Sequence, residues 1–256
     1  MCRIFGIQLA VHVSFLLLLA WFAYVGWREG GMVGAGWSLL LVTAFFGCVV
    51  LHELGHSLTA MRYGVRVPRI LLMPIGGMAE FDRLPRRPLA EFLITAAGPA
   101  VNFALVALLL PFVWTDLWST EPVPAHGLRD LLLSLAGANA VMGIFNLLPV
   151  FPMDGGRILR ALLASRLPYL RATYWASLVG RVLALVFAAV AAFEYGNYLL
   201  SFLFVFIYFA GDAEYRQVLA REREAAYWAE RARLAAMAPG PDDGQPPPPL
   251  IYHGRN

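Results

Sequence analysis

The sequence predicts an all-α polytopic membrane protein with about six transmembrane helices and a small membrane-associated β-hairpin or sheet near residues 64–82. Three observations support this prediction. Of the 256 residues, 59% are hydrophobic and only 14% are charged, whereas a soluble domain carries about 25% charged residues. The mean hydropathy is +0.63. Finally, apolar stretches of about 20 residues, the length needed to span a bilayer, recur along most of the chain.

Six apolar stretches qualify as spans. The first, residues 7–27, is too long for the hydrophobic region of a signal peptide and has no small-residue cleavage site after it, so we take it as a spanning helix. The others cover residues 36–60, 89–113, 131–151, 175–194 and 197–211. The fourth stretch ends in a proline-containing segment and the last is short.

The segment between the second and third stretches predicts some β-structure. Gly76-Gly77 separates two short apolar runs, which is typical of a tight turn in a hairpin. An edge strand there could pair with an extended peptide. An amphipathic connector without strands fits the spacing equally well.

The distribution of arginines predicts how the helices are oriented in the membrane. The arginines gather near the chain ends and between alternate pairs of spans, and the opposite loops hold only Arg28 and Arg129. By the positive-inside rule, both termini and residues 61–88 and 152–174 are cytoplasmic. We therefore expect an integral protein of a bacterial or archaeal cell membrane. The arginines do not form a stripe with interleaved aromatic residues, which argues against nucleic-acid binding.

The predicted organisation has three parts. A transmembrane core covers residues 1–211. Residues 212–237 mix Arg, Glu and Ala and predict a cytoplasmic surface helix, whose mixed charges are typical of a solvated face. Residues 238–256 are rich in proline and predict a disordered tail.

The second predicted span contains the motif with the clearest chemistry, His52-Glu53-Leu54-Gly55-His56. Residues four apart lie on one face of a helix, so both imidazoles can bind one zinc ion while Glu53 acts on a water there. Polar groups in an apolar span are costly in lipid, which favours a functional role. A packing role between helices is the alternative.

A catalytic zinc usually has three protein ligands and one open position. Asp154 is the best candidate for the third, because it follows the fourth span on the same predicted side as the histidines. The alternative is that Asp154 only caps the helix that follows it and binds no metal. Asn146 could contact a substrate carbonyl or the oxyanion formed from it. For Asn102 we favour an ordinary interhelical hydrogen bond.

Three motifs together resemble the site-2 protease family of intramembrane zinc metalloproteases. They are His52-Glu53-Leu54-Gly55-His56, then Gly98-Pro99-Ala100-Val101-Asn102, then the run with Asn146, Pro149 and Asp154-Gly155. The resemblance implies that His52, His56 and Asp154 bind one Zn²⁺ per chain and that Glu53 is the catalytic base. It also implies a sheet around Gly76-Gly77 near the substrate path.

Some members of that family carry an inserted PDZ domain or a C-terminal CBS domain. The segments available here are too short for either, so the chain looks like a minimal member. The expected function is hydrolysis of peptide bonds in membrane-spanning or membrane-tethered proteins. Two alternatives stay open: a zinc-containing binding protein without hydrolysis, and a metal-ion transporter. A transporter would need polar residues through the whole membrane depth, whereas here they cluster on one side.

Overall fold

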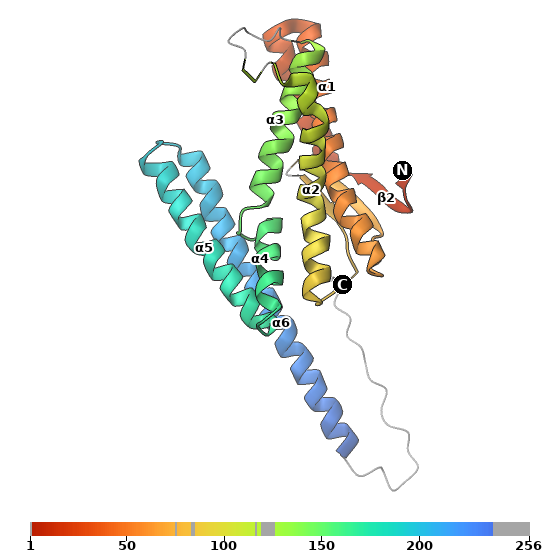
Figure 1. Cartoon of the computed structure of the whole chain (residues 1–256), viewed down its shortest axis with the longest axis vertical. Helices are drawn as coiled ribbons and strands as arrows, with labels where there is room; N and C mark the ends of the chain where they lie inside the picture. The colour runs from red at the N-terminus through yellow and green to blue at the C-terminus, as the bar shows by residue number, and fades with distance from the viewer. Residues whose placement is uncertain (1, 75, 83–84, 116, 119–125, 238–256) are drawn as a thin grey trace. The chain divides into compact units, whose positions relative to one another are not determined.

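The structure, a computed structural model, describes residues 2–74, 76–82, 85–115, 117–118 and 126–237. These residues form four strands and six helices (Figure 1). The strands are β1 (Cys2–Ile4), β2 (Ile7–Val11), β3 (Arg69–Met73) and β4 (Gly76–Ala79). The helices are α1 (Val13–Arg62), α2 (Pro88–Val113), α3 (Leu128–Asn146), α4 (Asp154–Ala164), α5 (Tyr169–Phe193) and α6 (Tyr198–Met237). The predicted disordered tail, residues 238–256, lies outside the described residues.

Five of these helices are long and apolar enough to cross a membrane: α1, α2, α3, α5 and α6. The prediction of a polytopic, mainly helical membrane protein is therefore confirmed. The remaining helix, α4, has only 11 residues, about 16 Å at 1.5 Å per residue, which is too short to span a bilayer of about 30 Å.

Helix α1 is a helical hairpin and supplies the first two predicted spans. Gly30 and Gly31 leave the helical conformation, with φ/ψ of −139°/20° and 60°/−146°. A straight helix would separate Phe15 from Phe46 by about 46 Å at 1.5 Å per residue, yet their ring centroids lie 4.6 Å apart. The two halves therefore run back along each other. Because α1 supplies two spans, the five long helices account for the six predicted spans.

The first span begins later than the sequence predicted. Residues 7–11 form strand β2 and pair in parallel with β3, with Gln8 opposite Arg69 and Val11 opposite Leu72. The helix starts only at Val13, after His12, whose ring nitrogen accepts a hydrogen bond from the backbone N–H of Ser14. A short apolar run is compatible with either a strand or a helix. Here the run forms a strand because it pairs with β1 on one side and with β3 on the other.

The β-structure predicted near residues 64–82 is confirmed as part of a four-stranded sheet in the order β1-β2-β3-β4. Strands β3 and β4 form the antiparallel hairpin, with Met73 opposite Gly76. Strand β4 lies at the edge of this sheet. The sheet packs on α1 through a shared apolar core that includes Ile7, Ile70 and Leu72 from the strands and Phe46 and Val49 from the helix.

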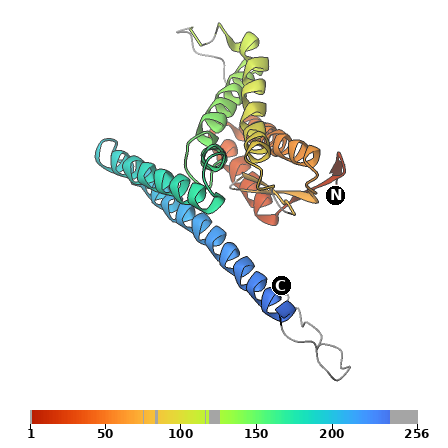
Figure 2. The same ribbon diagram turned by 60° about the horizontal axis from the view of Figure 1, so that its bottom comes forward.

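The fourth span ends at Asn146, earlier than the predicted residue 151. A segment of turns follows, in which Pro149 and Pro152 prevent a regular helix, and α4 then begins at Asp154. Figures 1 and 2 both show α5 and the first half of α6 side by side. Ser177 donates a hydrogen bond to the Gly211 carbonyl at 2.8 Å. Helix α6 continues without a break through residues 212–237.

Candidate metal site

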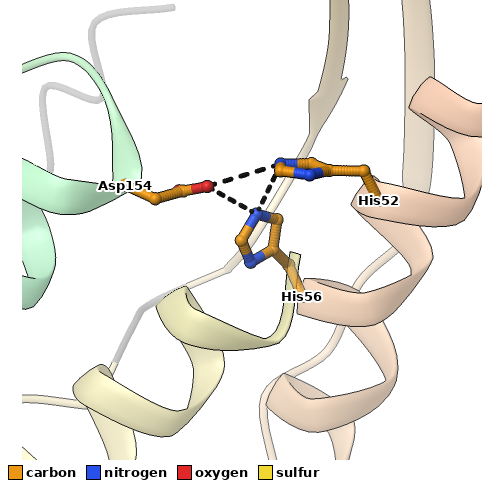
Figure 3. Close-up of side chains that lie close together, drawn as sticks. All are labelled: His52, His56 and Asp154. Carbon is orange, nitrogen blue, oxygen red and sulfur yellow. Dashed lines mark hydrogen bonds and ion pairs between the residues drawn. The ribbon is translucent and has the colours of Figure 1, made fainter. Parts of the chain in front are cut away.

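Three of the predicted site residues converge on one point. His52 and His56 project from the second half of α1, and Asp154 projects toward them from the first turn of α4 (Figure 3). The two Nε2 atoms lie 3.1 Å apart. Asp154 Oδ2 lies 3.3 Å from His52 Nε2 and 3.2 Å from His56 Nε2. The structure thus joins residues separated by nearly a hundred positions into a group that could hold a metal ion.

The three atoms that face one another are all hydrogen-bond acceptors. His56 Nδ1 lies 2.8 Å from the Ile94 carbonyl, which can only accept, so Nδ1 donates and Nε2 of the neutral ring keeps its lone pair. His52 Nδ1 lies 2.5 Å from Asn102 Oδ1 in the same way. Asp154 Oδ2 is buried and has no hydrogen-bond partner among the described residues. Three converging acceptors repel one another unless a cation lies between them.

The spacing of these atoms fits zinc. Bonds of about 2.0–2.1 Å at tetrahedral angles place neighbouring ligand atoms about 3.3 Å apart. The three observed separations are 3.1, 3.2 and 3.3 Å. The group therefore matches three corners of a tetrahedron, and the fourth corner remains for a water or a substrate oxygen.

Two glycines let α2 approach the histidines closely. A Cβ at Gly98 of α2 would overlap the His56 imidazole and come within 2.8 Å of His52 Cε1. A Cβ at Gly55 of α1 would lie 2.8 Å from the Ala97 carbonyl oxygen. The contact between α1 and α2 at this level therefore requires glycine on both helices.

The group lies in a cavity of about 620 Å³. Glu53 and Asn146 line the same cavity as His52, His56 and Asp154, so the structure brings all five predicted site residues together. Edge strand β4 also lines it. The position of a Cβ on Gly77 would lie only 2.7 Å from Glu53 Cγ, so the strand backbone passes directly beside the Glu53 side chain.

Two polar residues have a larger part in this site than the sequence indicated. Asn102 makes the expected interhelical hydrogen bond, with its Nδ2 2.9 Å from Asn139 Oδ1, but its Oδ1 also contacts His52. Asn139 was not singled out from the sequence. An amide within an apolar helix was the available signal, and it does not reveal which helix it faces.

Known proteins are similar to this chain in sequence and in fold. Residues 40–117 and 116–187 match the description "Peptidase family M50". Zinc metalloprotease MJ0392 of Methanocaldococcus jannaschii is 37% identical over 84% of this chain and 60% of that protein. Putative zinc metalloprotease Rip3 of Mycobacterium tuberculosis is 33% identical over 83% of this chain and 57% of that protein.

The chain therefore spans about 60% of the length of these curated relatives. Among solved structures, the site-2 protease from Methanocaldococcus jannaschii superposes with a TM-score of 0.58 at 36% identity. That match covers 84% of this chain and 94% of the solved one.

Proposed function

Because the chain belongs to peptidase family M50, we propose that it is an intramembrane zinc metalloprotease of the site-2 type. It hydrolyses peptide bonds of membrane-spanning or membrane-tethered proteins. The observation that carries this proposal is the convergence of two imidazoles and a carboxylate beside Glu53, in one cavity among helices long enough to cross a membrane.

In this proposal His52, His56 and Asp154 hold one Zn²⁺ per chain. The donor set supports it, because two imidazoles and one carboxylate with an open fourth position are the arrangement of a catalytic zinc site. When bound there, zinc supplies a Lewis acid that lowers the pKa of a bound water from its bulk value to about 7 and polarises the scissile carbonyl.

The residues of the chain provide the rest of the chemistry. Glu53 is the only carboxylate besides Asp154 among the described residues that line the cavity. It accepts the proton of the attacking water and returns it to the departing amine. Asn146 lines the same cavity from the end of α3 and donates a hydrogen bond from its amide to the developing oxyanion.

The substrate enters as an extended peptide. A peptide bond within a helix is shielded by its own backbone hydrogen bonds, so the helix must unwind before hydrolysis. Edge strand β4 has a backbone edge without a strand partner in the described sheet and lines the cavity beside Glu53. Strand addition there would hold the unwound segment against the catalytic residues.

The membrane orientation follows from charge. Arg62, Arg66 and Arg69 follow the second span, and Arg157, Arg160 and Arg166 follow the fourth. In this proposal both termini are cytoplasmic, the protein lies in a bacterial or archaeal cell membrane, and the site lies in the cytoplasmic half of the bilayer.

Glu53→Gln tests the function. The variant keeps all three proposed ligands, so it should retain one zinc per chain while cleavage falls by about 10²-fold or more, the usual contribution of a general acid–base group. Zinc content is measured by atomic absorption on purified protein. Cleavage is read as the accumulation of uncut membrane proteins, found by mass spectrometry of membranes from cells that carry the variant.

Asp154→Ala is the complementary variant and should lose both zinc and cleavage. Full zinc in Asp154→Ala would remove Asp154 from the ligand set. Identical membrane proteomes in wild-type and Glu53→Gln cells, with zinc present in both proteins, would favour the binding protein without hydrolysis.

A further inference from the structure

A chain of hydrogen bonds leads away from the metal site into the helix bundle. His52 Nδ1 contacts Asn102 Oδ1 on α2 at 2.5 Å, Asn102 Nδ2 contacts Asn139 Oδ1 on α3 at 2.9 Å, and Asn139 Nδ2 contacts the Leu135 carbonyl at 2.8 Å. Asn102 and Asn139 are both 0% exposed. These hydrogen bonds therefore connect His52 on α1, through Asn102 on α2, to a backbone carbonyl on α3.

The direction of every bond in this chain follows from its last member. The Leu135 carbonyl can only accept, so Asn139 must direct its NH₂ group toward it and its oxygen toward Asn102. Asn102 then directs its own NH₂ group toward Asn139 and its oxygen toward His52. An oxygen facing the ring requires that His52 donate, so Nδ1 carries the hydrogen.

We propose that Asn139 is a positioning residue that, through Asn102, holds His52 in the tautomer protonated on Nδ1 and so keeps its Nε2 lone pair free for the metal. This inference rests on the proposed zinc site. Neutral imidazole has two tautomers, and the partner of one nitrogen decides which one is present. Asn139 contacts neither the metal ligands' Nε2 atoms nor the cavity.

The comparison between the two histidines shows why Asn139 is needed. His56 is oriented by the Ile94 carbonyl, which can only accept a hydrogen bond and therefore fixes the tautomer of that ring by itself. His52 is oriented by an amide, and an amide rotated by half a turn presents its NH₂ group in place of its oxygen. Asn102 alone would therefore accommodate either tautomer of His52, and the Asn139–Leu135 pair selects one.

A role in helix packing alone predicts something different. A hydrogen bond between Asn102 and Asn139 would then join α2 to α3, and its loss would lower stability without changing the His52 ring. The two roles separate when Asn139 is replaced by residues of similar size, one that offers Asn102 a hydrogen-bond acceptor and one that does not.

The test uses Asn139→Leu and Asn139→Asp. Leucine offers no acceptor, so the Asn102 amide can turn and His52 should populate both tautomers. Aspartate keeps an oxygen facing Asn102, so the tautomer should persist. Loss of a partner that orients a ligand typically weakens metal binding 10–100-fold. We expect about tenfold weaker zinc binding for Asn139→Leu and a value close to wild type for Asn139→Asp.

Two measurements are made on full-length protein in detergent. Zinc affinity comes from competition with a chelator. The tautomer comes from the ¹⁵N shifts of histidine-labelled, metal-free protein, with the His52 signal assigned by its loss in His52→Gln. The wild type should show Nδ1–H at His52, and Asn139→Leu should show a mixture.

Each outcome decides the inference. An Nε2–H tautomer in the wild type overturns it, whether or not either variant folds. Equal zinc affinity and equal tautomer in Asn139→Leu and Asn139→Asp also overturn it and leave a packing role. Failure of the wild type to bind zinc at all would contradict the proposed function, while the tautomer measurement would still decide the role of Asn139.

Discussion

At the scale of single residues, Gly98 is a position where the site tolerates little change. Its missing side chain provides the space that the two imidazoles occupy. Gly98→Ala would displace the His56 and His52 imidazoles, and a site that needs ligand atoms within a few tenths of an ångström would no longer form. We expect the purified variant to contain little or no zinc, as measured by atomic absorption.

Gly47→Ala is the matched control for this prediction. Gly47 lies on the same helix as the histidines, and a Cβ there would meet nothing within 4 Å. Its zinc content and cleavage should equal those of the wild type. One zinc per chain in Gly98→Ala would show that α2 can shift away from α1 without losing the site.

Residues close in sequence were the easiest part of the site to predict. His52, Glu53 and His56 lie within two turns of one helix, so helix geometry alone brings them together. Asp154 was predicted because its span ends on the same side of the membrane. Asn102 and Asn139 could not be assigned in this way, because their contacts depend on how α2 and α3 are rotated against each other, and the apolar composition of both helices leaves that rotation open.

At the scale of elements, α4 is held in place by a buried ion pair. Arg160 Nε and Nη2 lie 2.7 and 2.6 Å from Glu91 Oε1 on α2, and Nη1 lies 2.9 Å from Glu214 Oε1 on α6. The side chains of Arg160 and Glu91 are only 3% and 2% exposed. Since α4 begins at Asp154, this pair also holds the proposed third ligand near the histidines.

Arg160→Met should therefore destabilise the protein strongly. Removal of one partner leaves the Glu91 carboxylate buried and unpaired, at a cost of about 3–5 kcal/mol. We expect a lower unfolding midpoint in detergent, measured by circular dichroism, together with reduced zinc content. The double variant Glu91→Leu with Arg160→Met removes both charges and should recover most of the stability.

Arg69→Met is the control for that prediction. Arg69 forms an ion pair of similar length with Glu80, at 2.7 Å, but the two side chains are 47% and 36% exposed. Exposed pairs contribute little to stability because water screens them, so the midpoint should barely change. An equal drop of the unfolding midpoint in Arg69→Met and Arg160→Met would show that burial does not explain how much the Arg160–Glu91 pair contributes to stability.

The elements also show where apolar patterning stops being informative. It located each helix that is long and apolar enough to cross a membrane among the described residues, because length and hydropathy suffice for that. It did not distinguish strand β2 from the helix after it, because residues 7–11 form a strand by pairing both with β1 and with β3, about sixty positions later. It ended the fourth span at residue 151, although the helix stops at Asn146, because the proline-containing turns that follow are equally apolar.

At the scale of the whole molecule, the remaining prediction concerns orientation in the membrane. The hairpin in α1 makes residue 29 follow the first span, whereas residue 165 follows the fourth. These positions lie on opposite sides if all spans cross. Arginine is retained on the cytoplasmic side because its transfer through the bilayer is costly. The arginines around residue 165 therefore predict that residue 165 faces the cytoplasm and residue 29 faces outward.

Single cysteines at these positions can test the orientation, in a background with Cys2 and Cys48 replaced by alanine. A membrane-impermeant maleimide applied to intact cells should label Glu29→Cys and leave Ser165→Cys unlabelled, and both should react once the cells are permeabilised. Both native residues are exposed, so burial in the protein would not protect either. The reverse pattern would place α4 and Asp154 toward the outer face, and substrates would then be cut on that side of the bilayer.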